Sequence, residues 1–167
     1  EVTRYSKPMM AIKLKNDDEL VNVTTAKEDT LFVTHNGFYL RFKTSEIPVV
    51  GVKASGVKGI NLKEDYVIYG ADIKEEDEYL NIFTNIHTGK RIKLSDLSLI
   101  SRAKKGNMLF KKAKTKDYKL DYAYLTNSKD VNLCKIDTDI KEVKNSEIPI
   151  MDITSTGTVL SKKQVDL

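Results

Sequence analysis

The sequence of 167 residues lacks several features that mark large functional classes. It has one cysteine, Cys134, so an internal disulfide cannot form, and this favours a reducing compartment. No window approaches the ~18 apolar residues of a membrane span. The polar start, Glu1–Tyr5, has no signal-peptide pattern. We therefore expect a cytoplasmic protein without a membrane segment.

Patterns for catalysis and metal binding are also missing. There is no P-loop and no Ser/His/Asp order that resembles a catalytic triad. The two histidines, His35 and His87, have no cysteine or third histidine nearby, so we expect no metal site. The acidic residues of 17–18 and 75–77 are interpreted as solvated turns, not as a paired-carboxylate active site. The sequence thus predicts no catalytic residue and no cofactor in this chain.

What the sequence does contain is a repeated strand–turn–strand unit. Thr34-His35-Asn36-Gly37 separates two apolar runs, and related arrangements return at Thr84 and Thr126, after 50 and then 42 residues. A period in the 40s with a strand–turn–strand core is typical of bladed or solenoid β architectures. We therefore predict an all-β fold with a partial blade at 1–28, blades at 29–73 and 74–120, and a diverged terminal blade at 121–167. Because the sequence begins inside a repeat, we expect it to be a fragment of a longer protein.

Alternation along the chain predicts individual strands and their faces. Residues 9–14 and 20–23 are expected to be strands before the first hairpin, whose turn is the Asn36-Gly37 pair. In the strand that leaves this turn, the apolar residues are expected to face the core: Phe38, Leu40 and Phe42. The aromatic and basic residues between them are expected to be exposed: Tyr39, Arg41 and Lys43.

The net charge of +4 is unevenly distributed along the chain. Residues 90–119 hold 11 Lys/Arg against 2 Asp/Glu, whereas residues 1–89 hold 11 against 14. Such a concentration of positive charge is expected of a face that binds a polyanion. A solvated lysine-rich surface without a ligand is the alternative, and composition alone does not separate the two.

Three segments carry a resemblance to a known family. Phe32–Phe38, Arg41–Pro48 and Ala54–Leu62 closely resemble a blade from the C-terminal domain of bacterial type IIA topoisomerase A subunits. The specific likeness covers residues 31–69, and weaker repeats extend it across the chain. Gyrase members carry a Gln-Arg-Arg-Gly-Gly-Lys-Gly box, which has no match here, because the glycine-lysine loops at 53–59 and 104–106 lack paired arginines. The resemblance therefore favours the topoisomerase IV branch of the family.

The resemblance implies a β-pinwheel, a propeller-like ring in which neighbouring four-stranded blades exchange strands. At this length the ring would be incomplete or open. It also implies a non-catalytic domain that binds and bends duplex DNA and helps to capture the transported segment for ATP-dependent decatenation and relaxation. The parent enzyme, a nucleoid-associated isomerase of A2B2 composition, would use ATP and Mg²⁺ through other domains or the partner subunit. A gyrase-type DNA-wrapping domain and a propeller-type protein-interaction module remain as alternatives.

In this family the outer rim of the pinwheel holds DNA, with lysine and arginine neutralising phosphates. The resemblance places the candidates on the strands that leave each turn and in the glycine-lysine loops, where backbone N–H groups can also reach phosphates. The candidate DNA-binding residues are Arg41, Lys43, Lys53, Lys58, Arg91, Lys93, Arg102, Lys104, Lys105, Lys111, Lys112 and Lys114.

Overall fold

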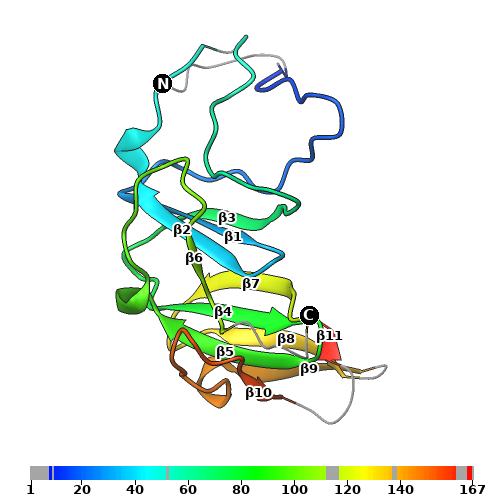
Figure 1. Cartoon of the computed structure of the whole chain (residues 1–167). Coiled ribbons are helices and arrows are strands. Elements are labelled where there is room, and N and C mark those ends of the chain that lie inside the picture. Colours follow the sequence, from blue (N-terminus) through cyan, green and yellow to red (C-terminus); the bar gives the residue numbers. More distant parts are fainter. Residues whose placement is uncertain are drawn as a thin grey trace.

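The computed structural model describes residues 8, 10–51, 53–111, 117–136, 139–160 and 165–166, and these form an all-β fold (Figure 1). Three hairpins are each followed by a three-residue 3-10 turn. The first comprises β1 (Asp29–Thr34), β2 (Phe38–Lys43) and η1 (Thr44–Glu46); the second β4 (Tyr79–Thr84), β5 (Thr88–Lys93) and η2 (Leu94–Asp96); the third β8 (Val131–Ile136), β9 (Asp139–Lys144) and η3 (Asn145–Glu147). No helix in this part of the chain is long and apolar enough to cross a membrane.

The remaining strands flank these hairpins: β3 (Val67–Ile73), β6 (Asn107–Met108), β7 (Leu120–Thr126), β10 (Thr158–Val159) and β11 (Val165–Asp166). The sheet orders are β3-β1-β2-β6, β10-β5-β4-β7 and β11-β8-β9. In the first two sheets, therefore, both outer strands come from the chain that follows the hairpin in sequence. The strand exchange that the resemblance implied is confirmed, and the described sheets are stacked as an open series and not as a closed ring (Figure 1).

The main core lies between the first and second sheets. Its fully buried members include Leu31, Val33, Leu80, Ile82 and Leu120, which come from strands of both sheets. Burial of these side chains against one another is the principal source of stability, because a single blade cannot cover its own apolar face.

The predicted exposure of one face of β2 is wrong for its aromatic residue. Tyr39 is buried together with Leu40 and Phe42, which face the other way. The reason is that the segment after β5 covers this face: the Tyr39 hydroxyl accepts a hydrogen bond from the backbone N–H of Ser98 at 3.0 Å. Since the cover comes from the next unit, alternation within β2 could not reveal it.

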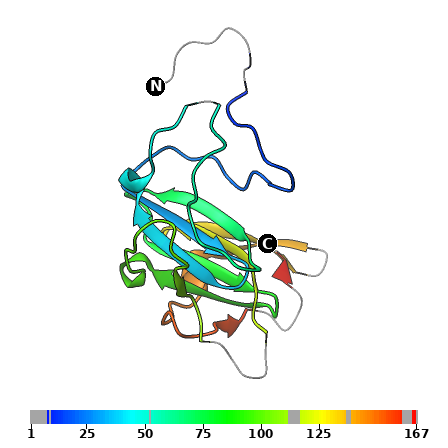
Figure 2. The same cartoon turned by 45° about the horizontal axis from the view of Figure 1, so that its top comes forward.

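The strands predicted before the first hairpin are also not formed. Residues 10–28 are irregular, and Figure 2 shows them as a long loop beside the first sheet. Position 9 lies outside the described residues. In the other units the corresponding segments, β3 and β7, pair with the preceding hairpin. The described residues 10–28 pair with no strand, and Leu20 and Val23 are exposed.

Candidate nucleic-acid interface

The candidate interface is built from the loops that follow the hairpins. We call residues 44–62 loop 1, residues 94–111 loop 2 and residues 145–160 loop 3; residue 52 lies outside the described residues. Each loop opens with its 3-10 turn, and the last two residues of each turn are a serine and an acid. Ile47, Leu97 and Ile148 donate their backbone N–H groups back to the first residue of that turn, at 3.0, 3.2 and 3.1 Å.

Loops 1 and 2 lie side by side and bring two glycine-lysine stretches together. The Asn61 backbone N–H donates to the Lys104 carbonyl oxygen at 2.9 Å, and the Ala103 N–H donates to the Gly59 oxygen at 2.7 Å. Lys58, Lys104 and Lys105 are exposed around this junction. These backbone bonds therefore hold three of the predicted lysines in one region of the surface.

Two of these lysines have partners within the protein. The Lys58 ammonium donates to Asn61 Oδ1 at 2.9 Å, and the Lys105 ammonium lies 4.4 Å from the centre of the Phe38 ring. Both contacts are exposed and weak enough to be exchanged for a phosphate. They orient the side chains without consuming their charge.

Arg102 joins the two loops. Its backbone N–H donates to Glu46 Oε2 at 2.8 Å, and its Nε donates to the Glu46 carbonyl oxygen at 2.9 Å. Its Nη1 donates to the carbonyl oxygen of Lys58. Arg102 therefore positions the lysines of the junction, and two of its guanidinium nitrogens are already engaged.

The predicted exposure is wrong for the two strand arginines. The Arg41 Nη2 donates to Asp29 Oδ2 at 2.6 Å, and its Nη1 donates to the Leu94 carbonyl oxygen at 2.8 Å. Arg91 is 7% exposed; its Nε donates to the Ile148 oxygen at 2.6 Å. Each arginine thus ties its strand to the 3-10 turn of the next unit, and its donors point into the protein.

Asp29 balances part of this charge. Its Oδ1 is 2.7 Å from the Lys43 ammonium, and its Oδ2 binds Arg41. Burial acts to raise the pKa of Asp29, but hydrogen bonds from Lys43 and Arg41 outweigh burial and lower the pKa below its ordinary value. Lys43 remains half exposed, so its charge is accessible but paired.

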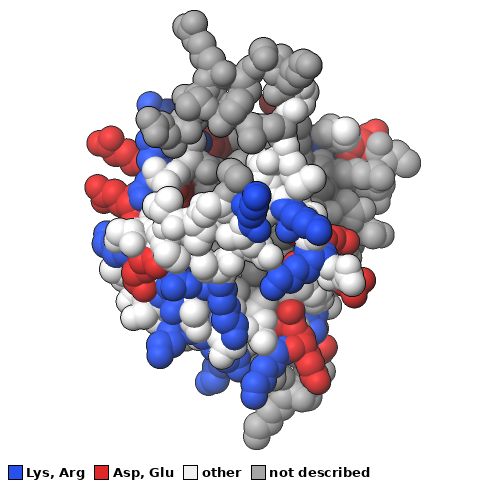
Figure 3. All heavy atoms as spheres, turned by 90° about the horizontal axis from the view of Figure 1, so that it is seen from above, with Lys and Arg blue, Asp and Glu red and all other residues white. Residues whose placement is uncertain are grey.

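The other candidates divide into two groups. Lys53, Lys93 and Lys111 are exposed, and the Lys111 backbone N–H donates to the Thr154 oxygen at 2.9 Å, which links loop 2 to loop 3. Lys112 and Lys114 lie outside the described residues. Figure 3 shows lysine and arginine side chains gathered across the face seen from above, with most acidic side chains toward its sides.

A buried lysine was missed by the sequence analysis. Lys90 has no exposed surface, and its ammonium donates to the carbonyl oxygens of Asp152, Ile153 and Ser155 at 2.7, 3.0 and 2.6 Å. Burial lowers the pKa of Lys90 to about 8, although the charge of Asp152 opposes this shift. Its burial could have been predicted from its position in the repeat, because Lys90 lies 50 residues after Leu40, a core residue of the preceding unit.

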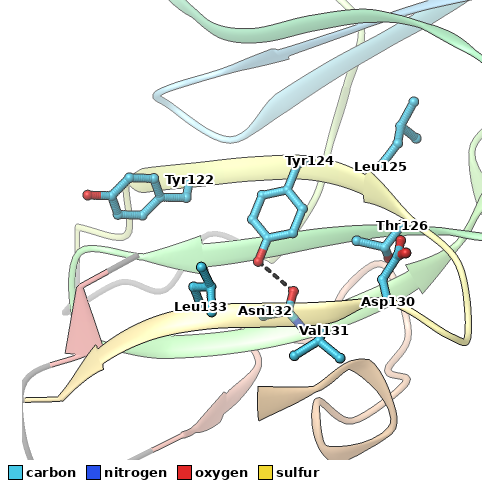
Figure 4. Close-up of a pocket in the computed structure, with 8 residues that line it drawn as sticks. All are labelled: Tyr122, Tyr124, Leu125, Thr126, Asp130, Val131, Asn132 and Leu133. Carbon is cyan, nitrogen blue, oxygen red and sulfur yellow. Dashed lines mark hydrogen bonds between the residues drawn. The ribbon is translucent and has the colours of Figure 1, made fainter. Parts of the chain in front are cut away.

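A cavity of about 360 Å³ lies between β7 and β8 (Figure 4). Its lining residues are Tyr122, Tyr124, Leu125, Thr126, Asp130, Val131, Asn132 and Leu133. The Tyr124 hydroxyl donates to Asn132 Oδ1 at 2.7 Å, and burial raises the pKa of this tyrosine. The lining has one carboxylate and no basic side chain, so the cavity does not suit an anionic ligand. Among the described residues there is also no group of three His, Cys, Asp or Glu side chains that could hold a metal ion.

Comparisons with known proteins agree with this fold. The family described as "DNA gyrase C-terminal domain, beta-propeller" matches residues 1–27, 28–73 and 78–121. The chain is 34% identical over 157 residues to the A subunit of DNA topoisomerase 4 from Bacillus subtilis, covering 92% of this chain and 20% of that protein. It is 37% identical over 123 residues to the corresponding protein of Staphylococcus epidermidis, covering 72% and 15%. The chain thus spans a fifth or less of these relatives.

Solved structures give the same result. A crystal structure of the C-terminal domain of DNA topoisomerase IV matches with a TM-score of 0.81 and 35% identity, over 94% of this chain and 50% of that one. A DNA gyrase A C-terminal domain matches with a TM-score of 0.77 and 20% identity, over 94% and 56%, which supports the fold alone. The chain therefore belongs to the family of C-terminal β-propeller domains of type IIA topoisomerase A subunits, and it resembles its topoisomerase IV relatives in sequence.

Proposed function

We propose that this chain is a non-catalytic domain that binds and bends duplex DNA within a topoisomerase IV A subunit. The observation that carries the proposal is the junction of loops 1 and 2, where exposed Lys58, Lys104 and Lys105 are held together by backbone hydrogen bonds. Lysines at such a junction would neutralise phosphates and release counterions, with little reading of base sequence.

In the whole protein this domain would hold the transported duplex for ATP-dependent decatenation and relaxation. ATP and Mg²⁺ would act through other domains or the ATPase B subunit of an A2B2 enzyme. The enzyme would work in the cytoplasm on the nucleoid. The names of the relatives, which are topoisomerase IV A subunits, support this assignment.

A protein-interaction module is the second candidate, and one observation favours it. Leu133 and Ile140 on the third hairpin are 62% and 74% exposed, and a contiguous exposed apolar patch can mark a protein-interaction site. A partner bound there would associate through apolar contacts and tolerate salt, whereas DNA binding weakens steeply as salt rises.

Fluorescence anisotropy with a labelled duplex, titrated at several salt concentrations, tests the proposal. We expect the 167-residue chain to bind DNA, with the logarithm of the binding constant falling linearly with the logarithm of the salt concentration. The magnitude of this slope should decrease by about 0.9 for each phosphate contact removed. The variant Lys104→Glu with Lys105→Glu should weaken binding and flatten this slope.

The matched control is Lys129→Glu with Lys141→Glu, which changes the net charge equally at two exposed positions near the third hairpin. It should leave the slope close to that of the unchanged chain. Equal losses from both variants would show a general charge effect, and a folded chain without DNA affinity would contradict the proposed function.

A further inference from the structure

Loops 2 and 3 have the same geometry on successive sheets. The backbone N–H of Ile100 donates to Arg41 O at 2.7 Å, and that of Met151 donates to Arg91 O at 3.0 Å. Gly106 and Gly157 follow with φ of 85° and 89°, and each lies directly against the strand that its loop covers. The glycines therefore align the loops and pair residues 102–105 with residues 153–156.

The outward chemistry of the two loops is opposite. Residues 102–105 of loop 2 include Arg102, Lys104 and Lys105, whereas the aligned residues 153–156 of loop 3 include no lysine or arginine and directly follow the acid Asp152. Asp152 Oδ1 accepts hydrogen bonds from the backbone N–H and the hydroxyl of Thr154 at 2.9 and 3.0 Å. These bonds lower the pKa of Asp152, so its exposed carboxylate is ionised at neutral pH.

The positive charge of this repeat lies beneath loop 3 instead of on it. Leu40 occupies the buried position under loop 2, and Lys90 occupies the corresponding position under loop 3. Three carbonyl oxygens of loop 3 turn inward to accept from the Lys90 ammonium. A phosphate at the surface cannot reach that ammonium, because the loop itself covers it.

From this contrast we infer that the DNA-binding track ends at loop 2, and that duplex held over loops 1 and 2 leaves the protein surface before loop 3, with Asp152 at the boundary. This inference rests on the proposed function and adds its spatial limit. A phosphate placed over residues 153–156 would find no basic side chain within that stretch to release counterions and would meet the ionised carboxylate of Asp152. Loop 2 is therefore the last described rim loop that can contact the duplex.

Directed cleavage of DNA can locate this end. Asn107 and Thr158 are matched sites, because each is the exposed first residue of the outer strand, β6 or β10, that follows its loop's glycine. Each is changed to cysteine and labelled with an iron chelate that cuts the DNA backbone nearby. Cys134 is buried, and burial raises the pKa of its thiol, so labelling is directed to the introduced site.

Asn107→Cys is expected to cut the bound duplex, and Thr158→Cys is expected to cut no more than free reagent does. Comparable cleavage from both sites would overturn the inferred boundary. Anisotropy on the same labelled proteins distinguishes a failure of DNA binding from a wrong position of the boundary. If DNA does not bind, the proposed function fails and the boundary with it; if DNA binds but residue 107 does not cut, the track has been placed wrongly.

A second variant tests the boundary by moving it. Asp152→Asn with Thr154→Lys raises the net charge of loop 3 by two, and Asp121→Lys makes the same charge change at an exposed position on β7. The loop 3 variant should steepen the salt slope by about 0.9 for each phosphate gained and should allow cleavage from residue 158. The same changes caused by Asp121→Lys would show that overall charge, and not the chemistry of loop 3, sets the footprint.

Discussion

Replacing Lys90 with methionine isolates the contribution of the buried ammonium. Methionine keeps most of the apolar length of lysine but donates no hydrogen bond. The carbonyl oxygens of Asp152, Ile153 and Ser155 would each lose their bond to Nζ. The change therefore removes one of the contacts that hold loop 3 to the second sheet, while it leaves the packing volume nearly constant.

Two opposing effects set the magnitude. Each lost hydrogen bond to a charged donor is worth about 1.5–3 kcal/mol, and removing the ammonium relieves a desolvation penalty of several kcal/mol. Lys90 is fully buried and binds three acceptors, but burial lowers its pKa to about 8, so the penalty outweighs the bonds for the charged form. At neutral pH we therefore expect Lys90→Met to change the free energy of unfolding by less than about 2 kcal/mol, because the two effects offset each other.

The pH dependence has a definite sign. The pKa of Lys90 is about 8 in the folded chain and 10.5 for an unperturbed lysine, so the unfolded chain binds this proton more tightly. Raising the pH through this interval favours the folded state, and the shift corresponds to about 3 kcal/mol in full. Below the folded pKa both states are protonated and the contribution is constant. We define the stability gap as the free energy of unfolding of the unchanged chain minus that of Lys90→Met. This gap should therefore increase from about pH 8 upward.

Urea unfolding of both proteins between about pH 7 and pH 10, followed by circular dichroism, measures this gap. Other groups that titrate in the interval cancel in the difference. Lys93→Met is the control, because Lys93 is exposed at the end of the same strand and should change stability by less than about 0.5 kcal/mol. A gap that narrows as the pH rises would refute the reasoning, since it would mean that the carbonyl oxygens stabilise the ammonium more than burial destabilises it.

Two further changes test the joints between units. Asp29→Asn should cost about 2 kcal/mol at neutral pH, because Arg41 loses its buried carboxylate. Since the pKa of Asp29 is lowered by folding, its contribution is present above the unperturbed value of 3.8 and is lost as the pH falls through the lowered pKa; acid titration of both proteins should show their stabilities converging. Gly106→Ala should cost about 2 kcal/mol or more, because a Cβ there would collide with the Tyr39 carbonyl oxygen, whereas Gly56→Ala, with similar φ but open space, should cost less in thermal unfolding.

Local chemistry made the hairpins predictable. The Asn36-Gly37 pair predicted a turn, and the structure places β1 and β2 on either side of it, with Gly37 at φ of 85°. The longer sequence of residues 31–69, and not the turn alone, indicated the family. The exposure of the lysines in loops 1 and 2 was also predicted from the sequence, because glycine beside lysine is typical of exposed loops.

The features that sequence reasoning missed all depend on contacts between units. Tyr39 and Arg91 are buried because the following unit folds over them. The segments 9–14 and 20–23 were predicted to be strands, but their described residues pair with no hairpin. A pattern within one strand reports the faces of that strand, and it cannot report which distant segment will cover each face. Strand exchange makes this limitation general, because one outer strand of each of the first two sheets, β6 or β10, follows the next hairpin in sequence.

The basic segment at 90–119 therefore serves two purposes that a charge count cannot separate. Lys90, Arg91 and Arg102 donate to backbone carbonyl oxygens of other units, and a carbonyl accepts such a bond without cancelling the charge. Their charges still contribute to the long-range field that would attract DNA. They cannot all bind phosphates, however, because their donors are in use. The salt slope of binding should therefore count fewer contacts than the local excess of positive charge suggests, and exposed Lys104 and Lys105 should dominate it.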